Sequence, residues 1–163
     1  MHLQRFKQGH INIRRKYGVH GRMVLNHESI GGEKTIYTLE SPWNSNKDEP
    51  NGILGLSCIA AGNYNIYVEQ SPVNNRYYPF LVNESKGVCL KSKVNAHEKT
   101  GHAFVDFESA DPLETYGRYI LCGTSYRFDP KGYYAPEYAE DAVSTIIKYI
   151  EATGDKSLTI SWS

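Results

Sequence analysis

Cysteine and histidine are the residues of this 163-residue chain best suited to nucleophilic or metal chemistry. A cysteine attacks as a thiolate, which needs a nearby base or cation. Cys58, Cys89 and Cys122 lie among apolar neighbours, without a CxxC motif or zinc-finger spacing of Cys and His. An odd number of cysteines is also a poor disulfide framework. We therefore expect three buried, reduced thiols.

The segment from His97 to His102 reads His-Glu-Lys-Thr-Gly-His and resembles the zinc-binding helix of metalloproteases only superficially. That motif places its two histidines on one helical face, so that both reach one metal ion. Here the histidines are one residue further apart and Gly101 lies between them. We expect an exposed polar loop, no metal site and no cofactor.

Charged residues also cluster in two places. Four carboxylates lie close together in the sequence, namely Asp106, Glu108, Asp111 and Glu114. Paired carboxylates can carry out acid–base chemistry or bind Ca²⁺. The glycine of a calcium-binding loop is absent, so a solvated acidic loop is expected. The basic run at 14–16 gives no continuous phosphate-binding stripe, because adjacent residues of a strand point to opposite faces.

Tyrosine occurs 13 times and forms two adjacent pairs, Tyr77–Tyr78 and Tyr133–Tyr134. Exposed tyrosine is enriched at protein–protein interfaces. It also packs well within a β-sheet. Both interpretations stay open: sheet packing, or an interface to which these four tyrosines and Trp43 contribute.

The elements that position these residues are mostly strands. Segments that alternate, or that are rich in β-branched and aromatic residues between turn-forming residues, predict strands; they are 11–17, 22–25, 34–40, 63–69, 77–82, 87–91, 103–107, 119–122 and 158–162. Residues 41–57 are rich in Pro, Gly and Asn and predict a long loop. Loops of this length are often functional.

One segment, 135–152, has helical periodicity, with apolar residues on one face. Pro136 suits its first turn, and Gly154 is placed to end it. The expected fold class is therefore mainly β (α+β). We predict a single domain over 1–163, with mostly antiparallel strands in a sandwich or partly open barrel, one amphipathic helix and a final strand.

The chain carries no net charge, since Lys plus Arg and Asp plus Glu both number 18. The 40% hydrophobic content argues against disorder. A basic excess is missing, which removes the simplest argument for nucleic-acid binding. No apolar run approaches the roughly 18 residues of a membrane span, and the N-terminus lacks the apolar region of a signal peptide. We expect a soluble domain that binds neither membranes nor nucleic acid.

Two stretches carry a family resemblance: Thr-Leu-Glu-Ser-Pro-Trp-Asn at 38–44 and Ser-Cys-Ile-Ala-Ala-Gly-Asn-Tyr at 57–64. They resemble a family of uncharacterised phage and bacterial domains, the DUF5675 family. Its pattern is like Thr-Leu-Glu-x-Pro-Trp followed by Ser-Cys-Ile-Pro-x-Gly-x-Tyr. The resemblance is strong over 38–66 and loose over 11–123, and in the first half only Ala61 departs from it.

The same blocks are distantly similar to L,D-transpeptidase (YkuD-like) domains, in which a histidine assists a cysteine thiolate that attacks an acyl group. Asp106 stands where that histidine would be, and Arg118 stands where the cysteine would be. Arginine cannot be this nucleophile. If the chain is an enzyme, we expect His102 or Asp106 within hydrogen-bond reach of Cys122 or Glu40 in one cleft.

The resemblance and the replaced nucleophile imply a non-enzymatic, phage-associated protein, most simply a structural component of a virion tail or baseplate. Its partners would be other virion proteins or copies of itself, and its location the virion or the host cytoplasm. Two alternatives stay open. One is a peptidoglycan-acting cysteine enzyme of the L,D-transpeptidase type, and the other is a phage-encoded inhibitor of a host protein.

Overall fold

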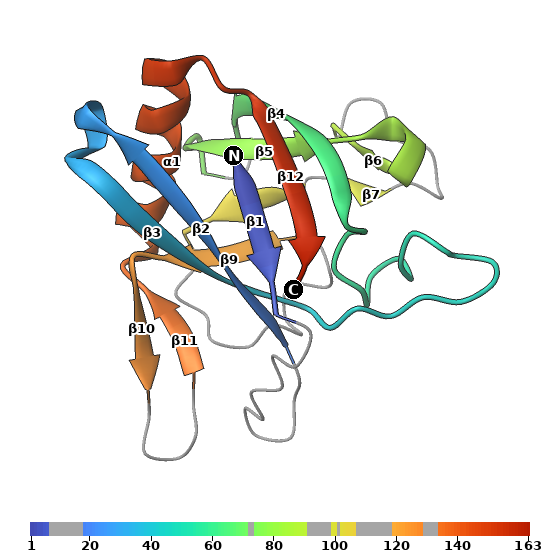
Figure 1. Ribbon diagram of the computed structural model, residues 1–163. Helices are drawn as coiled ribbons and strands as arrows, with labels where there is room; N and C mark the ends of the chain where they lie inside the picture. Colours follow the sequence, from blue (N-terminus) through green and yellow to red (C-terminus); the bar gives the residue numbers. More distant parts are fainter. Residues whose placement is uncertain (7–17, 72–73, 91–98, 101, 107–118, 129–133) are drawn as a thin grey trace.

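A computed structural model describes residues 1–6, 18–71, 74–90, 99–100, 102–106, 119–128 and 134–163. Strands dominate these segments, with one α-helix and two short 3-10 turns (Figure 1). In chain order the elements are β1 (His2–Arg5), β2 (Val19–His27), η1 (Glu28–Ile30), β3 (Gly32–Glu40), β4 (Gly62–Gln70), β5 (Tyr77–Val82), η2 (Glu84–Lys86), β6 (Val88–Cys89), β7 (Lys99–Thr100), β8 (Ala103–Val105), β9 (Tyr119–Gly123), β10 (Ser125–Phe128), β11 (Tyr134–Glu137), α1 (Ala139–Thr153) and β12 (Ser157–Trp162).

Eight of the strands form a closed barrel in the order β1-β12-β4-β5-β8-β9-β3-β2. The mainly β prediction is confirmed, but the sandwich and the partly open barrel are wrong. The sheet is also mixed, because β1 pairs with β12 in parallel and β8 pairs with β9 in parallel. Closure depends on the pairing of the first strand with the last one. Such a pairing is set by tertiary packing and leaves no local signal in the sequence.

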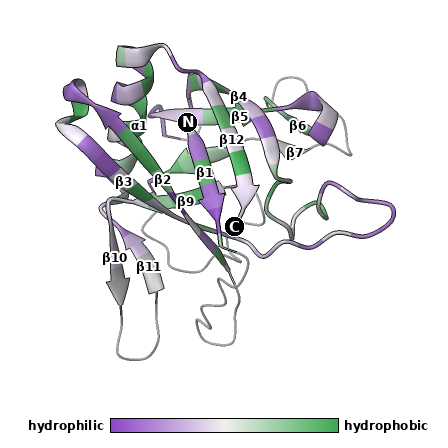
Figure 2. Ribbon diagram, in the orientation of Figure 1, coloured by the Kyte–Doolittle hydropathy of each residue, from purple (hydrophilic) through white to green (hydrophobic). Residues whose placement is uncertain are grey.

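Alternation along the strands separates the barrel interior from its outer face. In β2, for example, Val19, Met23 and Leu25 are buried whereas Val24 is exposed. The inward residues join side chains of the other strands and of α1 in one hydrophobic core. Figure 2 shows the same alternation as green and purple bands along the barrel strands.

Helix α1 lies over one end of the barrel, which we call the helix end. It contacts η1, which is the turn between β2 and β3, and it also contacts β5, β8 and β9. Its apolar face is buried in the core and is formed by Ala139, Ala142, Val143, Ile146 and Ile150. As predicted, Gly154 ends the helix in the left-handed conformation, and its N–H donates to the carbonyl of Ile150 at 2.8 Å.

The predicted start of this helix, at 135, is wrong. The residues before α1 belong to β11, where Pro136 pairs with Tyr126 of β10. Tyr138 then adopts a left-handed backbone, with φ of 59°, and the helix begins only at Ala139. A turn of this kind breaks the chain direction between the hairpin and the helix, which the apolar periodicity could not reveal.

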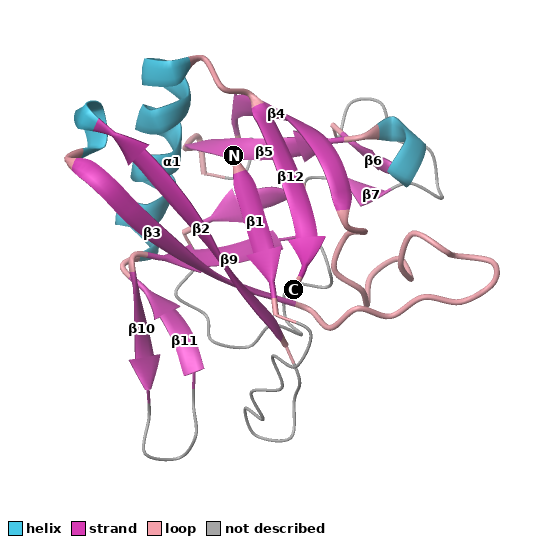
Figure 3. Cartoon of the chain, viewed as in Figure 1, coloured by secondary structure: helices cyan, strands magenta, loops and turns pink. Residues whose placement is uncertain are grey.

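The predicted loop at 41–57 is confirmed and extends to Ala61, without helix or strand (Figure 3). The predicted strand at 11–17 lies outside the described residues. Within the described part of the chain, no helix has the length and apolar character needed to cross a membrane.

Candidate functional site

The two blocks of the family resemblance meet at the end of the barrel opposite α1, which we call the loop end. Strand β3 starts beside η1 at the helix end and finishes at Glu40, so Glu40 marks the loop end. Arg5 finishes β1 at the same end, because β1 runs antiparallel to β2. The loop at 41–61 leaves from Glu40 and returns to the start of β4 (Figure 3).

A buried ion pair joins Arg5 to Glu40. The Arg5 Nε donates to Glu40 Oε2 at 2.8 Å, and Nη2 donates to Oε1 at 2.7 Å. The remaining guanidinium nitrogen, Nη1, donates to the carbonyl oxygen of Ile59 at 2.7 Å. The side chains of Arg5 and Glu40 are 0% and 2% exposed. One guanidinium therefore fixes the end of β3 and the returning arm of the loop together.

The surroundings of Arg5 keep its guanidinium charged. Burial acts to lower the pKa of Arg5, but Glu40 outweighs it and the pKa lies above its usual value. The indole of Trp162 lies 5.3 Å from the guanidinium carbon. Burial also raises the pKa of Tyr64, whose hydroxyl donates to the carbonyl of Ala60 at 2.6 Å. Arg5 therefore keeps its proton at any physiological pH. It holds the loop in place and cannot act as a proton donor.

The first and second blocks of the resemblance also interlock through their backbones. The N–H of Cys58 donates to the carbonyl of Pro42 at 3.3 Å. Ser57 Oγ accepts from the N–H of Asn44 at 2.9 Å and donates to the carbonyl of Cys58 at 2.8 Å. Ser57 and Cys58 are both buried. Their contribution is to hold the two arms of the loop side by side.

Cys122, the candidate nucleophile, is enclosed in the barrel interior on β9. Its side chain is fully buried, and its thiol donates to the carbonyl of Val105 at 3.4 Å. Burial and the nearby Asp106 carboxylate both raise the pKa of this thiol. Cys58 and Cys89 are buried as well, and none of the three cysteines forms a disulfide. In this conformation Cys122 is a protonated thiol without access to a substrate.

Of the other candidate catalytic residues, only Asp106 is placed beside Cys122 by the strand register, through the parallel pairing of β8 and β9. His102 is buried at the opposite end of β8, four residues away, or roughly 13 Å along an extended strand. Glu40 is occupied by Arg5. The structure thus brings Asp106 to Cys122, leaves His102 at the other end of β8, and engages Glu40 with Arg5.

Asp106 belongs to a separate polar network at the helix end. The hydroxyl of Tyr78 donates to Asp106 Oδ1 at 2.9 Å and accepts from Asn74 Nδ2 at 2.7 Å. Arg76 forms an ion pair with the buried Asp106 and another, at 3.3 Å, with Glu140 on α1. Burial raises the pKa of Tyr78. Sequence reasoning missed Arg76, whose partner is 30 residues away.

The candidate interface residues have different surroundings. Tyr77 and Trp43 are exposed, whereas Tyr78 is buried in the network just described. Tyr133 lies outside the described residues, and Tyr134 lies on β11. Sequence reasoning missed two exposed leucines in the same loop as Trp43, namely Leu54 and Leu56, 41% and 55% exposed. Apolar residues in a loop otherwise rich in polar residues were the available signal.

Several other candidates fall on undescribed residues: 14–16, 97–98, Glu108, Asp111, Glu114 and Arg118. Among the residues that the structure describes, no group of three or more His, Cys, Asp or Glu could hold a metal ion. Comparison of the chain with models of protein families, with curated proteins and with solved structures gave no match.

Proposed function

We propose that this protein is a non-enzymatic binding protein, and that it serves as a phage-associated structural component of a virion tail or baseplate through protein–protein contacts. The single observation that carries the proposal is the loop at 41–61, which presents Trp43, Leu54 and Leu56 to solvent. Exposed apolar residues gathered on one segment are typical of interaction sites.

The loop is ordered by contacts of its own, which favours a binding role. Ile53 N–H donates to the carbonyl of Asn44 at 2.8 Å, and Leu54 N–H donates to Glu49 Oε2 at 2.8 Å. Asn46 Oδ1 accepts from the N–H of Asp48 and of Glu49 at 2.9 and 2.7 Å. Together with the Arg5 contact to Ile59, these bonds fix the loop before any partner arrives, and a pre-organised loop loses less entropy on binding.

The placement of the thiols also favours a binding role over the peptidoglycan-acting cysteine enzyme. A thiol enzyme needs an accessible thiolate with a base in reach. Cys122 is enclosed and its pKa is raised, and His102 lies at the other end of β8. The virion assignment itself rests on the family resemblance of 38–66. A phage-encoded inhibitor of a host protein would use the same exposed loop. The two roles differ in the partner, which is a virion protein in one case and a host protein in the other.

The proposal is tested by light scattering on the purified protein over a concentration series, with Leu54→Ser/Leu56→Ser as the loop variant. A discrete oligomer that dissociates in the loop variant would support assembly through the loop. Val24→Ser is the matched control, because Val24 is an exposed apolar residue on β2, away from the loop. If the loop variant assembles just as the original protein does, the loop is not the contact surface.

A further inference from the structure

A groove on the outer face of the barrel has the chemistry of a ligand site and plays no part in the function proposed above. Its volume is about 660 Å³, within the range of pockets that hold small molecules. It runs over β4, β12 and the end of β5. It is lined by Asn63, Tyr64, Asn65, Tyr67, Val82, Asn83, Glu84, Ser157, Leu158 and Thr159.

The strand alternation explains why the groove is polar. On β4, Tyr64 and Ile66 point into the core, so Asn63, Asn65 and Tyr67 line the outer face. The register sets Thr159 opposite Asn63 and Ser157 opposite Asn65. Neutral amides and hydroxyls from neighbouring strands therefore form a continuous row, and η2 borders it at Glu84.

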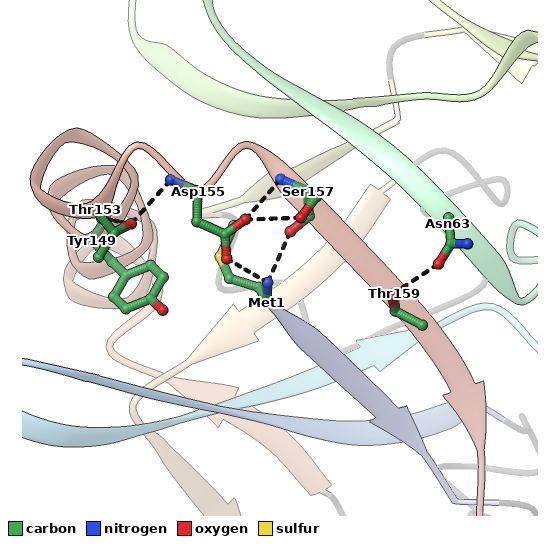
Figure 4. A network of polar contacts seen from close by, with 7 residues as sticks. All are labelled: Met1, Asn63, Tyr149, Thr153, Asp155, Ser157 and Thr159. Atoms are coloured by element: carbon green, nitrogen blue, oxygen red, sulfur yellow. Dashed lines mark hydrogen bonds and ion pairs between the residues drawn. The ribbon is translucent and has the colours of Figure 1, made fainter.

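Part of this row is held in position. Thr159 Oγ1 donates to Asn63 Oδ1 at 2.8 Å (Figure 4), which leaves the Asn63 NH₂ group as a donor. Asn83 Nδ2 donates to the backbone carbonyl of Asn63 at 2.7 Å, and Asn83 Oδ1 accepts from Ser85 at 2.6 Å. Side chains that are fixed before a ligand binds lose little entropy when it does.

The remaining lining groups select the class of ligand. Tyr67 is 45% exposed, so its ring can pack against the apolar C–H face of a sugar while its hydroxyl bonds a polar group. The Glu84 carboxylate accepts hydrogen bonds from hydroxyl groups. None of the described residues that line the groove is Lys or Arg. Lys86 reaches over Gly62 beside the groove, but the lining itself offers a carboxylate and no cation, which favours an uncharged ligand over phosphates and other anions.

We propose that this groove binds a neutral oligosaccharide, with Tyr67 as the stacking platform and Asn63, Asn65 and Glu84 as hydrogen-bonding groups. The inference goes beyond the proposed protein–protein role and does not depend on it, since the loop residues Trp43, Leu54 and Leu56 do not line the groove.

The test is a titration of ¹⁵N-labelled full-length protein with chitotetraose and with maltotetraose, each to about 10 mM, which detects dissociation constants near 1 mM. We expect chemical-shift changes that concentrate on β4, β12 and Asn83 with at least one of the two sugars. Tyr67→Ala should weaken this binding about fivefold to tenfold, since one aromatic contact contributes roughly 1 kcal/mol. Tyr67→Phe, which keeps the ring, should bind within about twofold of the original protein.

Tyr77→Ala is the matched control, because Tyr77 is an exposed tyrosine on β5 that does not line the groove. It should leave the titration unchanged. Absence of shift changes with both sugars would overturn the proposal, as would shifts that stay the same in Tyr67→Ala. Tyr67 is on the surface, so this variant should keep its melting temperature, and a spectrum of folded protein confirms that lost binding is not lost structure. The loop variant Leu54→Ser/Leu56→Ser should bind sugar normally, which separates this proposal from the proposed function.

Discussion

Arg5 and Glu40 join two strands that are not neighbours. β2 lies between β1 and β3 in the barrel, and the guanidinium of Arg5 spans it through hydrogen bonds of 2.8 and 2.7 Å to the Glu40 carboxylate. The same guanidinium donates to the carbonyl of Ile59. The loop that carries Trp43, Leu54 and Leu56 is thus anchored by a charge pair inside the barrel.

Removing one partner of this pair should strongly destabilise the protein. Glu40→Gln leaves the Arg5 charge buried and uncompensated, and we expect a loss of about 3–5 kcal/mol in the free energy of unfolding. Urea denaturation measures it. Glu33→Gln is the control, because Glu33 is exposed on the same strand, and it should change stability by less than about 0.5 kcal/mol.

The double variant Arg5→Met/Glu40→Leu tests whether the loss comes from an unpaired charge. Replacing a buried ion pair by apolar residues of similar size is often neutral. The double variant should therefore be more stable than Glu40→Gln alone. A loss of under about 1 kcal/mol in Glu40→Gln would contradict the anchoring role.

Gly21 lies between Arg5 of β1 and Thr38 of β3 in the sheet, where a larger residue does not fit. A Cβ on Gly21 would lie 2.5 Å from the carbonyl oxygen of Gln4 and 3.0 Å from Thr38 Oγ1. Because the nearer atom belongs to the backbone, Gly21→Ala should cost about 1–3 kcal/mol. Thermal or urea unfolding measures this loss of stability. The control is Arg22→Ala, because Arg22 is exposed on the same strand. Equal stability of the two variants would mean that the strands separate without cost at this point.

The three thiols should not react in the folded protein. Cys58, Cys89 and Cys122 are buried, and burial and Asp106 raise the pKa of Cys122. Ellman's reagent should release no chromophore at pH 8 within minutes, and should react with all three thiols after addition of urea. Rapid reaction of the native protein, abolished by Cys122→Ala, would instead favour the cysteine-enzyme alternative.

Asp155 should stabilise the fold above mildly acidic pH. It accepts from the amino group of Met1 at 2.6 Å and from the N–H and hydroxyl of Ser157 at 3.0 and 2.8 Å (Figure 4). Partial burial acts to raise the pKa of this carboxyl, but these bonds prevail and the pKa lies below its usual value. The carboxylate is thus favoured in the folded state.

The pH dependence follows from that direction. The stabilisation by Asp155 is fully present above its unfolded pKa of about 3.9 and is lost as the pH falls through the lower folded value. Asp155→Asn should therefore be less stable than the original protein at pH 6, and the difference should shrink below about pH 4 in urea titrations. Asp48→Asn, on the exposed loop, should show little difference at either pH. A difference for Asp155→Asn that does not vary with pH would show that the carboxylate charge is not responsible.

Helices and strands were predictable from the sequence where one hydrophobic period, helical or alternating, runs through a segment. β3 and β4 coincide with the predicted strands at 34–40 and 63–69, and the end of α1 coincides with Gly154. The start of α1 was not predictable, because β10 captures Pro136 and Glu137 in a hairpin. The barrel closure depends on β1 pairing with β12 at the far end of the chain, and no local pattern encodes such a pairing.

The buried ion pair left a partial signal. Alternation places Glu40 on the inward face with Ile36, and it places Arg5 on the inward face with Leu3. Two opposite charges on inward faces predict a buried pair once β1 and β3 are known to lie on either side of β2. The exposed leucines left a weaker signal, namely apolar residues in a loop that is otherwise rich in polar residues.

The central claim, a virion component that binds through the loop at 41–61, is tested most directly by quantitative mass spectrometry of purified phage particles. Particles would be produced in cells that express either the original protein or Leu54→Ser/Leu56→Ser at equal levels. We predict a fixed number of copies per particle, comparable with tail or baseplate proteins, and at least a tenfold reduction for the loop variant, which corresponds to about 1.4 kcal/mol of lost binding. Absence of the original protein from the particles would contradict the account.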